Sequence, residues 1–550
     1  MRGRAIDRRT FLHLSGAAGA LAAAGLGGVS TRTDAAPPEA APVSPQSAGA
    51  VRPFDLDEAP IADLQRSMEN GSLTARSLAE SYLGRIEEID RGGPGVNAVI
   101  ETNPEALEIA AALDEERRAK GARGPLHGIP VLLKDNIDTG DRMMTTAGSL
   151  ALAGRRAVKD AFIVERLRAS GAVILGKTNL SEWANFRSSH SSSGWSARGG
   201  QTRNPYALDR NPCGSSSGSG AAVSANLCAV AVGTETDGSI VCPSNANGVV
   251  GIKPTVGLLS RAGIIPIAHS QDTAGPMART VADAAILLGA LAGIDSADAA
   301  TAASEGRAHA DYTRFLDARG LSGARIGVAR NFFGFSEKVD RILAAALDVM
   351  KAEGAVLVDP ANLEKAREHG DAEFEVLLYE FKADLNAYLA SAGGSVRTLA
   401  DVIDFNEKNR DREMPFFGQD IFVTAEGKGP LTEKAYRKAL ETCRKLSRKE
   451  GIDAVIREHE LDAIVAPTGG PAWMTDHVNG DHYSGGSSNA AAVAGYPNMT
   501  VPAGFIGALP VGISFFGAAW SEPTLVKLAY AFERATRVRK APRFLASVEA

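Results

Sequence analysis

The sequence predicts an α/β protein built around a single large mixed β-sheet with helices flanking it. Two observations support this prediction. Short apolar runs alternate along the chain with longer segments in which apolar residues recur at helical spacing. The 550 residues are 44% hydrophobic and 23% charged, an ordinary composition for a globular protein with a large core. Alternation of this kind is typical of structures in which helices cover a sheet.

The folded part of the chain begins with two predicted helices. Ser72 or Thr74 is a suitable N-cap for the first helix, because a side-chain oxygen can accept from the first turn. Asn103 followed by Pro104 is a suitable start for the second helix, and Gly121 is a suitable end.

Six short apolar runs then predict strands. A helix over 161–169, with Asp160 as its cap and Gly171 as its stop, separates the first two runs. Later helices are predicted over 341–352 and 523–534. The predicted strands are 131–133, 173–175, 325–329, 355–358, 463–466 and 511–515.

Three segments carry residues suited to nucleophilic chemistry. Lys134 ends an apolar run, Ser215 lies in a Gly/Ser-rich segment, and Ser239 follows 24 residues later in a glycine-bounded turn. A serine beside glycine can be approached closely and can direct backbone N–H groups at a developing oxyanion. A lysine at the end of a buried strand can lose its proton, because burial disfavours the ammonium form. Together the three residues supply a nucleophile and a base without histidine.

Each segment also has a simpler interpretation. A Gly/Ser-rich stretch is usually a linker, and a lysine at a strand end usually reaches solvent. Residues 214–218 match the Gly-x-Ser-x-Gly elbow of α/β-hydrolases, but the residues before them are polar and contain two prolines rather than a buried strand. No serine in the chain has a lysine three residues later, which argues against the Ser-x-x-Lys enzymes. The ordered combination of Lys134, Ser215 and Ser239 favours an active site.

At these residues the chain resembles the amidase signature family of serine hydrolases. Within that family it is most similar to bacterial peptide amidases, which share the run Thr-Glu-Thr-Asp-Gly-Ser ending at Ser239. The resemblance extends from about Leu56 to the C-terminal region, and it is weakest over 299–449. It implies one catalytic domain over 54–550. Further shared motifs occupy 124–130, 193–205, 251–257 and 272–276.

The resemblance also implies roles for individual residues. Ser239 would attack the amide carbonyl, and Ser215, held by a cis peptide bond to Ser216, would relay the proton to neutral Lys134. Water would hydrolyse the acyl-enzyme on Ser239, so no cofactor and no metal are expected. The oxyanion hole would consist of the backbone N–H groups of Thr236, Asp237, Gly238 and Ser239.

Asp237 stands where most members of the family have glycine. Its side chain could point away from the site and order the turn through its own backbone bonds. Alternatively, it could bind a backbone N–H group of a peptide substrate.

The cysteines and histidines give no metal pattern. The four cysteines lack Cys-x-x-Cys spacing, and buried free thiols are the preferred expectation. Bridges from Cys242 to Cys213 or to Cys228 are the alternatives, should the protein be exported. The Asp-His pairs at 476–477 and 481–482 could be imagined as metal ligands, but a solvated loop near the substrate entrance is the preferred interpretation.

The N-terminus resembles an export signal. Arg8 and Arg9 precede an Ala/Gly-rich apolar run over 14–29, a pattern typical of twin-arginine signals. We therefore predict a signal over 1–36, a Pro/Ala-rich linker over 37–53, and a periplasmic or extracellular protein. An uncleaved membrane anchor is the alternative.

The predicted function is hydrolysis of carboxamides with release of ammonia, on peptide C-terminal amides in particular. An aryl- or fatty-acyl amide hydrolase is a second candidate. The amidase component of a tRNA-dependent amidotransferase, its A chain, is a third, although the net charge of −6 shows no basic nucleic-acid footprint. A silent binding protein is disfavoured because all three catalytic residue types are present. The expected partner is a small-molecule or peptide amide, with no nucleic acid and no stable membrane association after signal cleavage.

Overall fold

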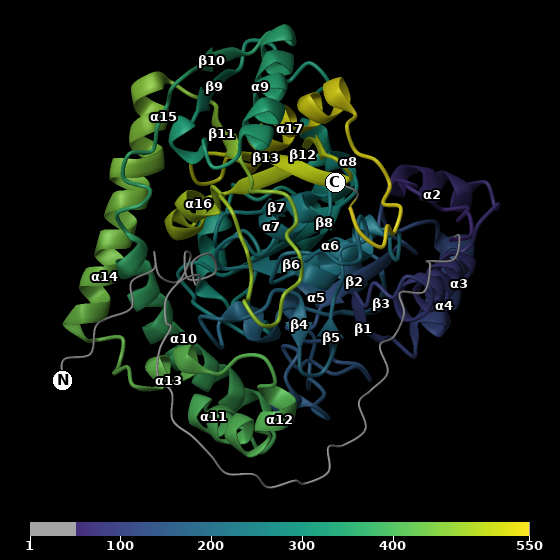
Figure 1. Ribbon diagram of the computed structural model, residues 1–550. Coiled ribbons are helices and arrows are strands. Elements are labelled where there is room, and N and C mark those ends of the chain that lie inside the picture. Colours follow the sequence, from purple (N-terminus) through teal and green to yellow (C-terminus); the bar gives the residue numbers. More distant parts are fainter. Residues whose placement is uncertain (1–50, 549–550) are drawn as a thin grey trace, which may run out of the picture.

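A computed structural model describes residues 51–548, which are organised around one sheet of eleven strands (Figure 1). The predicted signal at 1–36 and most of the linker lie outside the described residues. The sheet strands are β1 (Val99–Thr102), β2 (Pro130–Lys134), β3 (Val173–Thr178), β6 (Val230–Glu235), β7 (Val250–Lys253), β8 (Thr273–Ala278), β9 (Arg325–Val328), β10 (Val356–Val358), β11 (Ala463–Pro467), β12 (Asn498–Ile506) and β13 (Leu509–Phe516). A separate hairpin consists of β4 (Trp195–Ser196) and β5 (Gly200–Gln201).

The order of the strands is β1-β3-β2-β6-β8-β7-β12-β13-β11-β9-β10. β2 runs parallel to β3 and β6, and β9 runs parallel to β10 and β11. The remaining neighbours are antiparallel. The predicted fold class, a single large mixed sheet flanked by helices, is confirmed. Every residue of β2, β3, β6, β8, β11 and β13 is buried, which explains why several of these strands appear in the sequence as continuous apolar runs.

Two groups of helices pack on this sheet. α6 contacts β2, β3 and β6, and α7 contacts β7, β12 and β13. α8 packs on β7 and β8, and α9 and α17 pack on β12. The α-helices are α2 (Ile61–Glu69), α3 (Ala75–Arg85), α4 (Ala106–Lys120), α5 (Phe162–Ala169), α6 (Ser217–Ser224), α7 (Val241–Ala246), α8 (Val281–Leu291), α9 (Glu337–Ala352), α10 (Gly370–Ala392), α11 (Leu399–Lys408), α12 (Arg410–Glu413), α13 (Asp420–Glu426), α14 (Lys434–Arg444), α15 (Asp453–His459), α16 (Ser488–Ala494) and α17 (Glu522–Thr536).

The predicted helix ends are confirmed in part. Thr74 caps α3 in a capping box with Ser77, and Gly121 ends α4 with a φ of +82°. Asp160 is not the cap of α5, because that helix follows Ala161 without a side-chain cap. The Asp160 carboxylate instead accepts from the Gly140 N–H and pairs with Arg168 (2.8 Å).

Residues 370–444 form a helical layer that no motif predicted. These helices are drawn in green beside the sheet in Figure 1. A hydrophobic cluster joins α10, α11 and α13 to Ile265 and Ile267 in the segment between β7 and β8. Burial of apolar side chains against that segment stabilises the position of α10. The same contact places α10 close to the elements that carry the predicted site.

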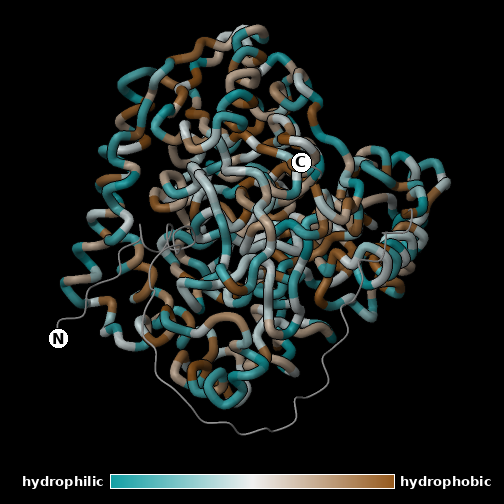
Figure 2. Tube along the Cα trace, viewed as in Figure 1, coloured by the Kyte–Doolittle hydropathy of each residue, from teal (hydrophilic) through white to brown (hydrophobic). Residues whose placement is uncertain are grey.

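The peripheral helices are amphipathic. Figure 2 shows hydrophilic and hydrophobic residues alternating along the outer helices. In α14 the buried face consists of Tyr436, Ala439 and Cys443. Within residues 51–548, no helix combines the length and the apolar composition needed to cross a bilayer.

Candidate active site

The predicted catalytic residues lie at one edge of the sheet. β2 ends at Lys134, and its parallel neighbour β6 ends at Glu235 just before the turn that carries Ser239. Because parallel neighbours end at the same edge, Lys134 and this turn come together. Ser215 lies just before α6, which packs on both strands. The fold therefore brings three segments that are far apart in the sequence into one site.

Lys134 is fully buried and donates to two hydroxyl groups. Its Nζ lies 2.8 Å from Ser215 Oγ and 2.8 Å from Thr234 Oγ1, with a third contact to the Thr234 carbonyl (3.2 Å). Desolvation lowers the pKa of Lys134 to about 7, against the opposing attraction of Asp272 and Glu235. Near neutral pH a large fraction of this amine is therefore uncharged and able to take a proton.

Two other lysines are equally buried. Lys177 Nζ donates to the Ile137 carbonyl and Thr145 Oγ1, and Lys253 Nζ donates to the Pro254 carbonyl. Burial lowers the pKa of both groups, that of Lys253 to about 8. Of the three, Lys134 is the one whose Nζ contacts a predicted catalytic serine, so geometry and not burial distinguishes it.

Ser216 joins the two serine segments. Its N–H donates to the Ser239 carbonyl (3.1 Å), and its hydroxyl donates to the Thr234 carbonyl (2.9 Å) and accepts from the Thr234 N–H (3.1 Å). Sequence reasoning gave Ser216 no such role, because nothing in the Gly/Ser run distinguishes one hydroxyl from the next. A direct contact between the hydroxyls of Ser215 and Ser239 stays a prediction.

The expected cis peptide bond between Ser215 and Ser216 is wrong by one residue. The cis bond joins Gly214 to Ser215. A Cβ at position 214 would collide with the side chains of Ser181 and Asn185, so this position requires glycine.

The turn before Ser239 contains a glycine in the left-handed region. Gly238 has a φ of +82°, a conformation that suits glycine. Ser215 is fully buried, whereas Ser239 is 9% exposed, so Ser239 is the more accessible of the two serines. After the turn, the N–H groups of Ile240 and Val241 donate to the Glu235 carboxylate (2.8 and 3.1 Å), which fixes the start of α7.

Asp237 contacts a distant helix. Its Oδ1 accepts from Ser488 Oγ (2.7 Å), and its Oδ2 accepts from Asn489 Nδ2 (2.9 Å), both at the start of α16. The side chain thus connects the turn to α16, a contact that neither of the two expectations for Asp237 included.

Two cysteines form a disulfide beside the site. Cys213 and Cys242 are bonded, with their Cα atoms 6.0 Å apart. The preferred expectation of free thiols is therefore wrong for this pair, because the fold juxtaposes segments that the sequence separates by 29 residues. Cys228 and Cys443 keep buried thiols as expected. The bridge joins the residue two before Ser215 to the residue three after Ser239.

The central part of the loop over 470–490 is exposed, as expected, with Met474 56% and Val478 93% exposed. Other residues of the loop contact the rest of the protein. Asp481 accepts from the Ser193 N–H (2.9 Å) and from Trp473 Nε1 (3.2 Å), and desolvation raises its pKa to about 6. His477 stacks on Phe416, with ring centroids 4.1 Å apart. These partners occupy the polar atoms of Asp481 and one face of the His477 ring.

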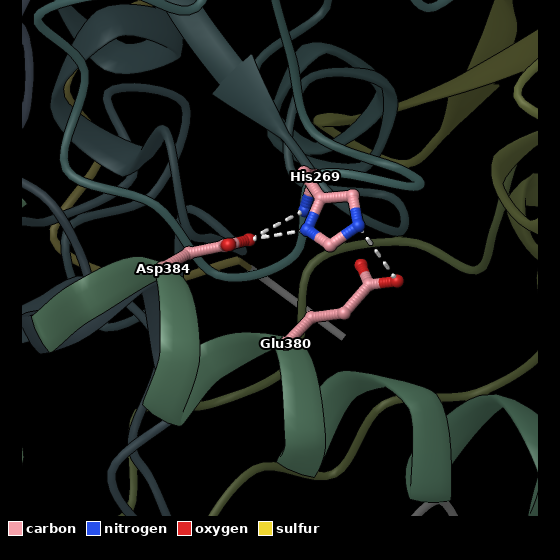
Figure 3. A group of neighbouring side chains, drawn as sticks. All are labelled: His269, Glu380 and Asp384. Carbon is pink, nitrogen blue, oxygen red and sulfur yellow. Dashed lines mark hydrogen bonds and ion pairs between the residues drawn. The ribbon is translucent and has the colours of Figure 1, made fainter. Parts of the chain in front are cut away.

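His269, in the segment before β8, is paired with two carboxylates of α10. His269 Nδ1 is 2.8 Å from Asp384 Oδ2, and His269 Nε2 is 3.4 Å from Glu380 Oε1 (Figure 3). The hydrogen bond with Asp384 raises the pKa of His269, which favours the imidazolium form. In the described residues this is a group of potential metal ligands within 4.8 Å of one another. Because the two ring nitrogens point at different carboxylates, the geometry is that of a charge-paired link and not of a metal centre.

A cavity of about 380 Å³ borders the site. Its lining includes Asn136, Thr234, Thr236, His269 and Tyr388. The Asn136 amide donates to Thr234 Oγ1 (3.0 Å), the same hydroxyl that Lys134 contacts. Thr234, which lines the cavity, therefore contacts the Lys134 amine directly.

The chain is similar to known proteins over most of its length. The family model described as Amidase matches residues 77–526. The chain belongs to the amidase family. The crystal structure of native peptide amidase from Stenotrophomonas maltophilia is similar, with 54% identity, a TM-score of 0.86, and coverage of 90% of this chain and 100% of that one. The predicted resemblance to peptide amidases is thereby confirmed.

More distant relatives include both amidases and components of amidotransferases. A probable amidase from Arabidopsis thaliana is 46% identical over 503 residues, covering 90% of this chain and 93% of the relative. The A chain of the glutamyl-tRNA(Gln) amidotransferase from Halorhodospira halophila is 34% identical over 488 residues, covering 86% of this chain and 97% of the relative. This amidase is thus more similar to these two amidases than to that amidotransferase component.

Proposed function

We propose that this amidase hydrolyses primary carboxamides through Ser239, Ser215 and Lys134, and that its substrates are peptides with a C-terminal amide. The observation that carries the proposal is the hydrogen bond between Lys134 Nζ and Ser215 Oγ, which joins two fully buried side chains. Burial favours a neutral amine, and the bond from the Ser216 N–H to the Ser239 carbonyl, one residue after Ser215, supports the proposed proximity of the two serines.

The proposed reaction begins with attack of Ser239 Oγ on the amide carbonyl carbon. Ser239 gives its proton to Ser215, which gives its own to neutral Lys134. Negative charge collects on the carbonyl oxygen, and preorganised N–H groups stabilise it there. The proposed donors are the backbone N–H groups of Thr236, Asp237, Gly238 and Ser239.

Breakdown of the tetrahedral intermediate returns the proton. Lys134, through Ser215, protonates the amide nitrogen as the C–N bond breaks, so ammonia leaves instead of an amide anion. Water then attacks the acyl-enzyme, gives one proton to the same relay, and releases the carboxylate together with regenerated Ser239.

The peptide-amide substrate is supported by the similarity to a named peptide amidase and by the shared turn 234–239. A primary amide also has a small leaving group, so the site needs little room beyond the scissile nitrogen. The test is ammonia release from matched substrates: a peptide amide, free asparagine and glutamine, an aryl anilide and a fatty amide. The proposal expects the highest kcat/KM for the peptide amide and no cleavage of internal peptide bonds. A higher kcat/KM for the fatty amide or the anilide would select the second candidate function.

Mass spectrometry gives an independent measurement of the product. Conversion of a C-terminal amide to an acid adds about one dalton and leaves the rest of the peptide intact. Internal fragments would contradict the proposal. A further assay measures ammonia transfer to a misacylated tRNA with and without added partner proteins. Transfer that occurs only when the partner proteins are present would instead support a role in an amidotransferase.

We also propose that the protein is exported. The support is the Arg8-Arg9 pattern and the apolar run after it. A disulfide between Cys213 and Cys242 suits an oxidising compartment. On this proposal the enzyme acts on small or peptide amides outside the cytoplasm, without nucleic acid and without stable membrane association after signal cleavage.

A further inference from the structure

The nucleophile turn is held by amide side chains from two distant segments. Gln271 Nε2 donates to the Thr236 carbonyl (3.2 Å), and Asn489 Nδ2 donates to Asp237 Oδ2 (2.9 Å). Gln271 lies just before β8, and Asn489 lies in the first turn of α16. Each amide therefore holds one of the two residues that open the proposed oxyanion hole.

One carboxylate binds both of these amides. Glu373, in the first turn of α10, accepts from Gln271 Nε2 (3.2 Å) through Oε1 and from Asn489 Nδ2 (2.7 Å) through Oε2. Its side chain is fully buried. An amide nitrogen carries two N–H groups, so each amide donates one to Glu373 and one to the turn.

This arrangement orients both amides. If either were flipped, its carbonyl oxygen would face a carboxylate oxygen of Glu373, and two acceptors would meet without a proton between them. Glu373 thus determines that the nitrogen of Gln271 and the nitrogen of Asn489 point at the turn.

The rest of α10 supports the same segment. Glu380 accepts from the Ser270 N–H (2.9 Å), and Asp384 accepts from the His269 N–H (3.0 Å). Positions 373, 380 and 384 are seven and four residues apart, which places them on one face of the helix. Figure 3 shows how the later two hold His269. Three acidic side chains on one face of α10 therefore accept hydrogen bonds from residues 269–271, which precede β8.

We propose that Glu373 is a positioning residue for the nucleophile turn, holding Thr236 and Asp237 in line for oxyanion binding through Gln271 and Asn489. The inference rests on the proposed function of that turn. Oxyanion stabilisation depends on donors fixed before the reaction, so a loosened turn lowers the rate of attack more than it weakens substrate binding.

The test variant is Glu373→Gln, which keeps the shape of the side chain and replaces one acceptor oxygen with a donor. The amide that faces the new NH₂ group of the glutamine can no longer donate there, so it loses its hydrogen bond to position 373. We expect kcat to fall about tenfold with KM within about twofold of wild type. The matched control is Glu375→Gln on the same helix, which removes the pair with Lys428 (2.6 Å) and leaves kcat unchanged.

A second measurement does not depend on the reaction. Hydrogen exchange of the peptide covering 233–242 should accelerate in Glu373→Gln and stay at the wild-type rate in Glu375→Gln. Faster exchange in a protein with no amidase activity would support the positioning role while contradicting the proposed function. Unchanged exchange together with unchanged kcat would overturn the inference.

A double-mutant cycle separates positioning from general destabilisation. Gln271→Met removes the donor between Glu373 and Thr236 and roughly conserves its volume. If Glu373 acts through Gln271, the loss of kcat in the double variant is smaller than the sum of the two single losses. Fully additive losses, or a fall in kcat that follows a fall in Tm below the assay temperature, would contradict the inference.

Discussion

Lys134 Nζ lies 2.8 Å from Ser215 Oγ at a point where neither side chain is exposed to solvent. A buried ammonium ion is costly, and the hydroxyl groups of Ser215 and Thr234 are the partners that satisfy the amine. The same desolvation that makes this lysine unfavourable as a cation makes it useful as a base. The proposed reaction would therefore use lysine where many serine hydrolases use histidine.

Ser239→Ala should abolish turnover and leave the fold intact, because it removes the attacking oxygen and little volume. The measurement is ammonia release together with labelling by a fluorophosphonate probe. A probe adduct that mapped to Ser216, or appreciable activity in the variant, would place the nucleophile elsewhere.

Activity should rise with pH through about 7 and stay high into the alkaline range. The sign follows from the lowered pKa of Lys134: below about 7 the amine is protonated and cannot accept the Ser239 proton, and above it the neutral base predominates. Lys134→Met should lose most activity at neutral pH and lose this limb of the kcat profile. Lys177→Met serves as the control, because Lys177 is equally buried but contacts neither serine. An unchanged profile in Lys134→Met would exclude Lys134 as the base.

Removing the Cys213–Cys242 disulfide should lower both stability and activity. The bridge closes a 29-residue separation, and a loop of that size is expected to contribute about 3–4 kcal/mol. Because it also joins the segments of Ser215 and Ser239, Cys213→Ser with Cys242→Ser should reduce kcat at temperatures where the variant remains folded. Cys228→Ser is the control for loss of a cysteine. Denaturant unfolding and kcat measured on the same samples check both effects, and equal values in the bridged and unbridged forms would refute the prediction.

Replacing Arg8 and Arg9 with lysine should trap active precursor in the cytoplasm, because the twin-arginine pair is the feature that an export machinery of this type reads. Cell fractionation and N-terminal sequencing of the mature enzyme measure the outcome. Export that is unaffected by the substitution, or a wild-type enzyme found in the cytoplasm with an intact N-terminus, would rule out the signal.

The six strands predicted from apolar runs are all present, with ends shifted by only a few residues. β2, β3, β11 and β13 are buried along their whole length, which gives a continuous apolar signal. β10 is also apolar in sequence, although it lies at the edge of the sheet and is partly exposed. α10 and its neighbours were not predicted. Their stability comes from packing against residues such as Ile265 and Ile267, which no local pattern reveals.

The sequence by itself determined the chemical types at the site. Lys134, Ser215 and Ser239 occur in order, each beside glycine or at a strand end, and their association with the amidase family follows from those motifs. Only the tertiary structure decided which of three buried lysines meets a serine, which two cysteines pair, and that Asp237 faces Asn489. The physical reason is range: a motif records neighbours along the chain, whereas desolvation and hydrogen bonding act between atoms that the sheet brings together from positions more than 80 residues apart.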